Sequence, residues 1–119
     1  MSLIVSSMSC QNVVGAPPPT LALDDHDTRV SSEEARALRS SCELAQARCS
    51  RCHTLDRVVL HEAASPRHWQ DQVQRMRRIA GSTISRPDGA AITRCLVYRS
   101  FGPDGLEALP DAAGQGVAR

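Results

Sequence analysis

The feature that most constrains this chain is the pentapeptide Cys49-Ser50-Arg51-Cys52-His53. Two cysteines separated by two residues and followed directly by a histidine form the attachment signature of c-type haem. This spacing places both sulfurs on one side of a helical turn, where they can bond to the two vinyl groups of one porphyrin. The histidine would then lie under the iron as its proximal ligand. The motif therefore predicts one covalent haem c, attached through Cys49 and Cys52 and ligated by His53.

Two other kinds of site use a similar pair of cysteines. A structural zinc site would combine the motif with a second pair of ligands at close spacing, but Cys42 and Cys95 each stand alone. A thioredoxin-type site would need a preceding strand and a βαβ pattern, whereas the sequence on both sides of the motif indicates helices. Inert thiols in a surface turn would leave the adjacent histidine without a role. We therefore favour haem attachment.

The composition agrees with a protein that contains a large apolar cofactor. The 119 residues suffice for one small domain with tails. The chain has one tryptophan, one tyrosine and one phenylalanine, so it lacks the large side chains that usually fill a core. A porphyrin would supply that missing apolar body. No stretch of the sequence is apolar over the length needed to span a membrane.

Charge is distributed unevenly along the chain, although the formal net charge is only +1. A chain this close to neutral does not have the composition of a nucleic-acid-binding protein. Residues 1–47 contain six acidic residues against three arginines, whereas residues 48–101 contain ten arginines against four acidic residues. There is no lysine in the chain. Docking of a partner protein by charge would therefore use arginine and would favour acidic partners.

Residues 1–30 are expected to form a disordered leader and linker. Small residues lead into Cys10, as at the end of a bacterial lipoprotein signal, which makes Cys10 a candidate for lipidation. The apolar run before it is shorter than the roughly 7–15 residues of a signal, and no basic region precedes it. A free cysteine in a loose tail is the alternative. The proline run at 17–19 favours an extended chain. His26, among three aspartates, is expected in a solvated turn, with weak metal binding as the alternative.

The first two expected helices begin at serines. Ser31, with an acid three residues later, matches a capping box, and its helix is expected to run to about Arg48, directly into the haem motif. Ser65, followed by proline, is expected to cap the second helix, which Gly81 would stop. Apolar residues at steps of four and three form one face of that second helix. They are Trp69, Val73 and Met76.

The third expected helix begins after Ser85, again with an acid three residues later. It is expected to end at Phe101, because glycine and proline follow in the positions usual at helix ends. Residues 102–119 are rich in glycine, alanine, proline and aspartate, so they are expected to be a disordered tail. The folded domain is thus predicted to span residues 31–101.

A haem needs a ligand or an open site on its distal side. Met76 is the only methionine outside the first eight residues, so it is the expected distal ligand, with ordinary core packing as the alternative. His61 would require the chain to double back over the opposite haem face, and His68 points away from the apolar face of its helix. Arg57 is expected to pair with a propionate, or else to lie in solvent, and Trp69 is expected to contact the haem.

These elements together resemble a small monohaem class I cytochrome c over residues 31–101. The resemblance depends on the helix leading into C-x-x-C-H, the segment W-x6-M from Trp69 to Met76, and a last helix around Cys95. The W-x6-M segment is similar to that in the haem domains of bacterial quinohaemoprotein dehydrogenases. The resemblance implies an all-α, cytochrome c-like domain of three to four helices wrapped around one covalent haem. Because the first and last helices cross in this family, it also implies a disulfide between Cys42 and Cys95, with two buried free thiols as the alternative.

The resemblance implies a periplasmic one-electron carrier with axial ligands His53 and Met76. It would pass electrons between a dehydrogenase or another cytochrome and a downstream acceptor, as a monomer or as a subunit of a redox complex. In bacteria c-type haem is attached outside the cytoplasm, and a lipidated Cys10 would add a membrane anchor.

An alternative function is a haem-based gas sensor or a peroxidase-like enzyme with an open or labile distal site. A peroxidase would want a histidine and an arginine near the open face as an acid–base pair. His61 or His68 with Arg67 could supply it, although nothing in the spacing requires this.

Overall fold

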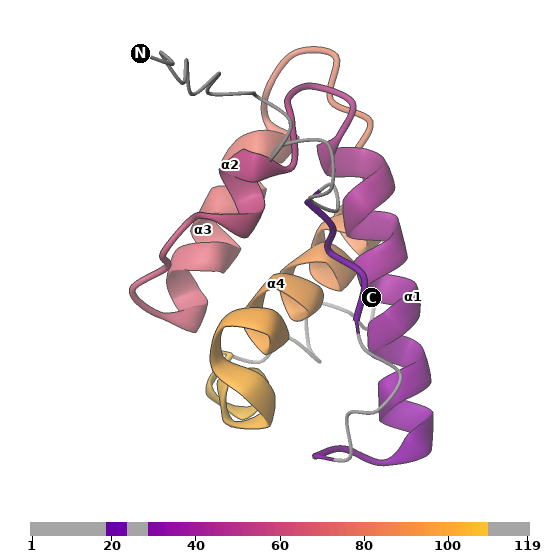
Figure 1. The fold of residues 1–119 in the computed structure, drawn as a ribbon. Coiled ribbons are helices and arrows are strands. Elements are labelled where there is room, and N and C mark those ends of the chain that lie inside the picture. The colour runs from indigo at the N-terminus through magenta and orange to yellow at the C-terminus, as the bar shows by residue number, and fades with distance from the viewer. Residues whose placement is uncertain (1–18, 24–28, 110–119) are drawn as a thin grey trace, which may run out of the picture.

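The structure is a computed structural model that describes residues 19–23 and 29–109. Every regular element in these ranges is a helix, so the expected all-α class is confirmed for the described part of the chain. The longest helices are the first and the last, and a single short turn of helix follows the haem motif (Figure 1). The elements are α1 (Ser32–Cys49), α2 (Asp56–Val59), α3 (Pro66–Arg77) and α4 (Arg86–Ala108).

The three helix starts expected from the sequence are confirmed. Ser31, Ser65 and Ser85 have extended backbones and lie one residue before α1, α3 and α4. In each case the serine hydroxyl oxygen accepts a hydrogen bond from the backbone N–H three residues later, at 3.1–3.2 Å. Such a cap stabilises a helix by about 1 kcal/mol. Helix α3 ends at Arg77, four residues before Gly81, which has a φ of 82°.

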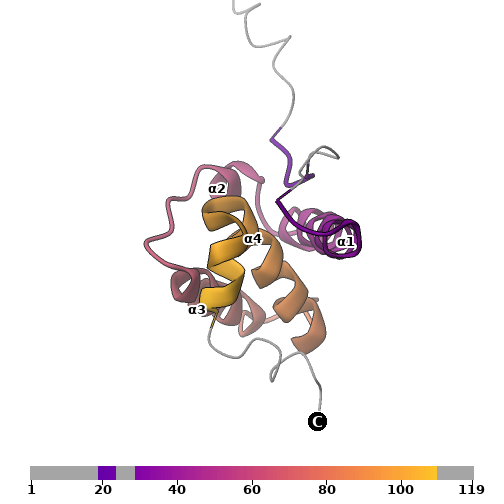
Figure 2. The same cartoon turned by 90° about the horizontal axis from the view of Figure 1, so that it is seen from below.

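Helix α4 is the centre of the fold. It packs against both α1 and α3, whereas α1 and α3 have little contact with each other. Figures 1 and 2 show α4 lying between the other two long helices. Its buried residues include Ile92, Cys95, Leu96, Val97 and Tyr98. The core of the described residues therefore consists mainly of the contacts that α4 makes with α1 and with α3.

The crossing of α1 and α4 contains a disulfide bond. Cys42 of α1 and Cys95 of α4 are bonded and both are fully buried. The pairing that the family resemblance implied is thus confirmed. On α1 the buried residues recur at helical spacing, so the disulfide lies on the face that packs against α4. They are Leu38, Cys42, Ala45 and Cys49.

The boundary predicted at residue 30 is wrong for the described part of the leader. Leu21 is only 1% exposed and belongs to the hydrophobic core. Its backbone N–H donates to the side-chain oxygen of Gln46 at 3.1 Å, and its carbonyl accepts from the Arg99 guanidinium at 3.1 Å. A single leucine in a proline-rich stretch gives no periodic signal, so its burial could not be predicted from the pattern. Cys10 and His26 lie outside the described residues.

The disordered tail predicted for 102–119 is also wrong over its first residues. The chain bends at Gly102, where φ is 73°, and helix then continues to Ala108. The expected stop was therefore a kink, because Pro103 suits the first turn of a new helical segment. Leu109 is 6% exposed and joins the core, which explains why this segment is ordered. Residues 110–119 lie outside the described ranges.

Replacing both Cys42 and Cys95 by alanine should lower the free energy of unfolding by roughly 2–4 kcal/mol. The disulfide joins residues 53 positions apart, and a loop of that length in the unfolded chain loses substantial entropy when it is closed. Urea unfolding followed by circular dichroism measures the change. Cys10→Ala is the matched control and should leave stability unaltered. A loss below about 0.5 kcal/mol in the double variant would contradict a stabilising role.

Candidate functional site

The C-x-x-C-H motif lies where α1 ends and the chain turns away. Cys49 is the last residue of α1 and is buried, and Ser50 is the C-cap. Cys52 is exposed in the turn that follows, and His53 is partly exposed. Both cysteines of the motif are free thiols in the structure. The helix predicted to lead into the motif is therefore confirmed, and it presents the first cysteine on its buried face.

The hydrogen bonding of His53 leaves one ring nitrogen available. Its Nδ1 lies 2.9 Å from the backbone carbonyl oxygen of Thr54. A carbonyl can only accept, so Nδ1 must carry the proton in this contact. The Nε2 atom then has a free lone pair. This is the arrangement by which a backbone carbonyl fixes the tautomer and orientation of a metal-binding histidine.

A pocket brings Met76 together with the motif. Met76 lies in the last turn of α3 and packs partly buried against the core. It shares the pocket wall with residues of the motif and of the connection between α3 and α4. The full lining is Arg48, Cys49, Cys52, His53, Met76, Ile79, Ser82, Thr83 and Ile84. The four side chains predicted to attach a haem or bind its iron therefore line one pocket.

A second pocket adjoins the first, because His53 and Met76 line both. Its volume is about 150 Å³, and its remaining wall consists of Arg57, Val58, His61, Trp69 and Gln72. The two residues predicted to contact the haem, Arg57 and Trp69, are thus on this wall. Trp69 is buried and its indole N–H donates to the Ser100 hydroxyl at 2.8 Å, which fixes the ring against α4. Their contact with a haem stays a prediction.

The donor set of these two pockets fits a c-type haem in chemistry. Two thiols, an imidazole with a free Nε2 and a thioether are the groups that covalent attachment and axial ligation require. The pocket at the motif has a volume of about 50 Å³, which is room for only one or two waters. A porphyrin would therefore require the ends of α1 and α3 to move apart. Such a movement disrupts little packing, because these two helices have little contact with each other.

The site also contains an ion pair that sequence reasoning missed. Arg48 lines the motif pocket, and its Nε lies 3.4 Å from a carboxylate oxygen of Asp88 in the first turn of α4. Both side chains are about one quarter exposed, at 28% and 24%. The pair links the end of α1 to the start of α4 beside the pocket. No sequence pattern relates two residues 40 positions apart, so only the packing reveals it.

Burial of Cys49 affects its acidity. Removal from water raises the pKa of the Cys49 thiol above its usual value, and the nearby Cys52 sulfur raises it further. The thiol form is therefore favoured in the folded protein with free cysteines. Because the thiolate is the reactive form, Cys49 should be the less reactive of the two while the fold is intact.

The rival histidine ligands are paired with each other. The Nε2 atoms of His61 and His68 lie 2.8 Å apart. His61 also lines the second pocket, whereas His68 lines neither. Among residues 19–23 and 29–109, no group of three or more histidine, cysteine, aspartate or glutamate side chains is close enough to hold a metal ion.

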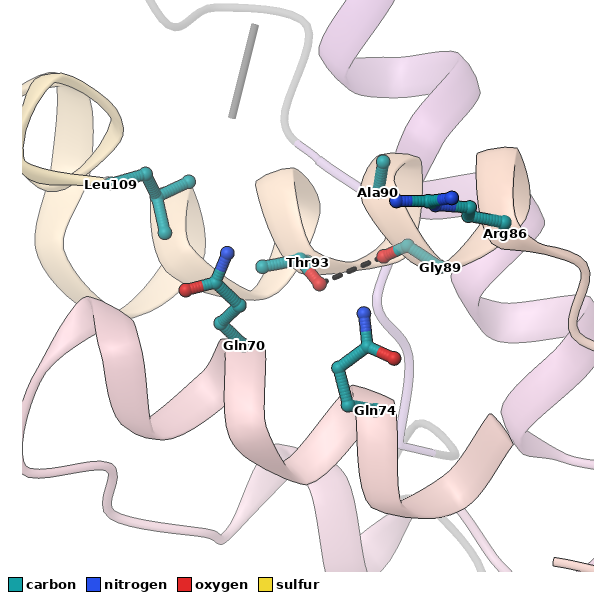
Figure 3. A pocket seen from close by; sticks show the side chains of 7 residues that line it. All are labelled: Gln70, Gln74, Arg86, Gly89, Ala90, Thr93 and Leu109. Atoms are coloured by element: carbon teal, nitrogen blue, oxygen red, sulfur yellow. Dashed lines mark hydrogen bonds between the residues drawn. The ribbon is translucent and has the colours of Figure 1, made fainter. Parts of the chain in front are cut away.

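A separate polar pocket lies between α3 and α4, with a volume of about 140 Å³ (Figure 3). Within it the Thr93 hydroxyl donates to the Gly89 carbonyl at 2.7 Å. The pocket contains none of the predicted site residues and shares no lining residue with the pockets at His53. Its wall consists of Gln70, Gln74, Arg86, Gly89, Ala90, Thr93 and Leu109.

Comparison with known proteins adds no family assignment. No protein-family model matches the chain, and no curated protein or solved structure shows significant similarity to it. Of the helices that the structure describes, none combines the length and the apolar character needed to cross a membrane.

In protein with free thiols, iodoacetamide should modify Cys52 at least about tenfold faster than Cys49 near neutral pH. Cys52 is exposed, whereas Cys49 is buried and its raised pKa lowers its thiolate fraction. Raising the pH should accelerate modification of Cys49. Peptide mass spectrometry on a Cys10→Ser background separates the two sites.

Unfolding in guanidinium chloride is the control for this experiment, because it should make the two rates similar. Equal rates in the folded protein would contradict the burial of Cys49.

Proposed function

We propose that this protein is a one-electron carrier with one covalently attached c-type haem. The observation that supports the proposal is the common pocket of Cys49, Cys52, His53 and Met76. The first three are close in sequence, but Met76 belongs to another helix. Ordinary core packing of a methionine would not require it to face the motif.

Each residue of the set has a separate role in this proposal. Cys49 and Cys52 form thioether bonds, which hold the cofactor permanently in the pocket. The bound haem supplies a reversible ferric–ferrous couple. His53 offers Nε2 as the proximal ligand, because the Thr54 carbonyl holds Nδ1 in its protonated form.

Met76 determines which class of haem protein this is. A thioether on the distal side raises the reduction potential and leaves no coordination position for a substrate. Ligation by His53 and Met76 therefore favours electron transfer over catalysis. Ile79 and Ile84 add apolar surface beside Met76, and apolar surroundings are a further means of tuning the reduction potential.

The redox partner in this proposal is an acidic protein, such as a dehydrogenase subunit or another cytochrome. Ile79 lines the motif pocket and is 59% exposed, so an apolar side chain lies at the mouth of the site. Arg51, Arg75 and Arg78 are exposed in the adjoining turns. A small apolar contact with surrounding positive charge suits a transient interface.

We place this function in the bacterial periplasm. The buried disulfide between Cys42 and Cys95 is suited to an oxidising compartment, and c-type haem is attached there. Lipidation of Cys10, which lies outside the described residues, would hold the carrier at a membrane surface.

A gas sensor or peroxidase-like enzyme is the second candidate. The observation that favours it is the wall of the second pocket, which includes both Arg57 and His61 next to Met76. A histidine and an arginine beside an open distal position could act as an acid–base pair. Displacement of Met76 from the iron would be required for this activity.

Replacing Met76 by alanine in the haem-containing protein should convert a low-spin spectrum to a high-spin one. It should also remove the weak long-wavelength band of ferric haem ligated by sulfur, because the variant lacks the thioether. Reduction should then allow carbon monoxide to bind, whereas the parent protein should not bind it. Absorption spectra of both oxidation states provide the measurement. Ile79→Ala, which alters the same pocket without removing a ligand, is the matched control.

One result would contradict the carrier proposal, and another would contradict the assignment of Met76 as the distal ligand. A high-spin spectrum in the parent protein, with carbon monoxide binding, would favour the sensor or enzyme. A low-spin spectrum that survives Met76→Ala but is lost in His61→Ala would assign the distal position to the histidine instead.

A further inference from the structure

The paired histidines at the start of α3 have no role in the proposed function. His61 belongs to the connection after α2, and His68 lies in the first turn of α3. Their Nε2 atoms are 2.8 Å apart, their ring centroids are 5.0 Å apart and their planes are inclined by 18°. Because the centroids are farther apart than the nitrogens, the rings meet tip to tip. The lone pair of one nitrogen is therefore directed at the other.

Such a pair can exchange its shared proton for a metal ion. Bonds from a histidine nitrogen to a divalent transition-metal ion such as Zn²⁺ are about 2.0–2.1 Å long. Two nitrogens 2.8 Å apart would then subtend close to 90° at the ion. This is the angle between neighbouring ligands in the tetragonal geometry of Cu²⁺ and Ni²⁺. A tetrahedral zinc site would need the nitrogens about 3.3 Å apart.

We propose that His61 and His68 form a binding site for a divalent transition-metal ion with tetragonal preference, with Cu²⁺ bound most tightly. Imidazole nitrogen suits this class of ion, and Cu²⁺ leads the affinity order of the divalent metals. Since no third side chain of a ligating type joins the pair within the described residues, water completes the coordination. The site is therefore an exchangeable one.

The surroundings support both ligands. Hydrogen bonding of the His68 backbone N–H to the Ser65 hydroxyl at 3.2 Å fixes the position of His68 on α3. Trp69 contacts the His61 ring edge to face, with centroids 5.0 Å apart. His61 is exposed and His68 is partly buried, so both rings can turn, by roughly 45° each, until their lone pairs meet at one ion. The charged neighbours of the pair are Glu62 and Arg67 in the sequence and Arg57 on the pocket wall that His61 shares.

Titration of the purified protein with Cu²⁺ tests this site directly. Any free thiols are first blocked with iodoacetamide, so that cysteine cannot bind the ion. Calorimetry should give one ion per chain, and electron paramagnetic resonance should show a tetragonal Cu²⁺ signal with nitrogen ligands. His61→Ala and His68→Ala should each weaken binding at least about tenfold, and the double variant should abolish it. Gln72→Ala, which alters a neighbouring side chain on the pocket wall that His61 shares, is the matched control and should bind as the parent does.

Two outcomes would overturn the metal site. One is a dissociation constant weaker than about 100 μM for the parent, which would leave only a hydrogen-bonded pair. The other is undiminished binding in the double variant, with circular dichroism showing an intact fold. The site uses none of Cys49, Cys52, His53 or Met76 as a ligand, and the mass of the titrated sample shows whether haem is attached, so a failure of the metal site is distinguished from a failure of haem attachment.

Discussion

The disulfide between Cys42 and Cys95 is the interaction on which the rest of the arrangement depends. It fixes α1 to α4 inside the core, and α4 in turn is the helix against which α3 packs. Cys49 lies about two helical turns beyond Cys42 on the same buried face. The contact that fixes α1 therefore also determines where the C-x-x-C-H motif lies. In a chain with so few aromatic side chains, a covalent bond supplies stability that a larger core would otherwise provide.

The candidate site is formed where two helices are positioned by a third without packing on each other. The end of α1 presents Cys49 and leads into His53, while the end of α3 presents Met76. All three residues line the motif pocket, and His53 and Met76 also line the second pocket. The ion pair of Arg48 and Asp88 links α1 to α4 beside this gap. An insertion between α1 and α3 would break few contacts between these two helices. The small volume of the pocket is therefore compatible with a wall whose side chains suit a haem.

Local sequence signals were sufficient for the helices, but contacts distant in sequence needed the structure. The serine caps and the apolar face of α3 depend on residues within one or two turns, so pattern predicts them. The disulfide was implied only by the family resemblance. Burial of Leu21 and helix formation beyond Gly102 were missed, because single leucines cover the core there and leave no periodic pattern. The pairings of Arg48 with Asp88 and of His61 with His68 could be seen only once the helices were placed. For the site itself, the sequence predicted Met76 by elimination, and the shared pocket now supports that choice.

The central claim is that Cys49 and Cys52 attach one haem. The most direct measurement is the intact mass of the protein produced in a bacterial host that attaches haem to C-x-x-C-H sequences in the periplasm. The account predicts a mass increased by one haem, a tryptic fragment around Cys49-Ser50-Arg51-Cys52-His53 that retains the added mass under denaturing conditions, and loss of both in Cys49→Ala/Cys52→Ala. The host should also attach haem to a known c-type cytochrome produced in parallel. If it does so and this chain still has its unmodified mass and two free thiols at these positions, the claim is contradicted.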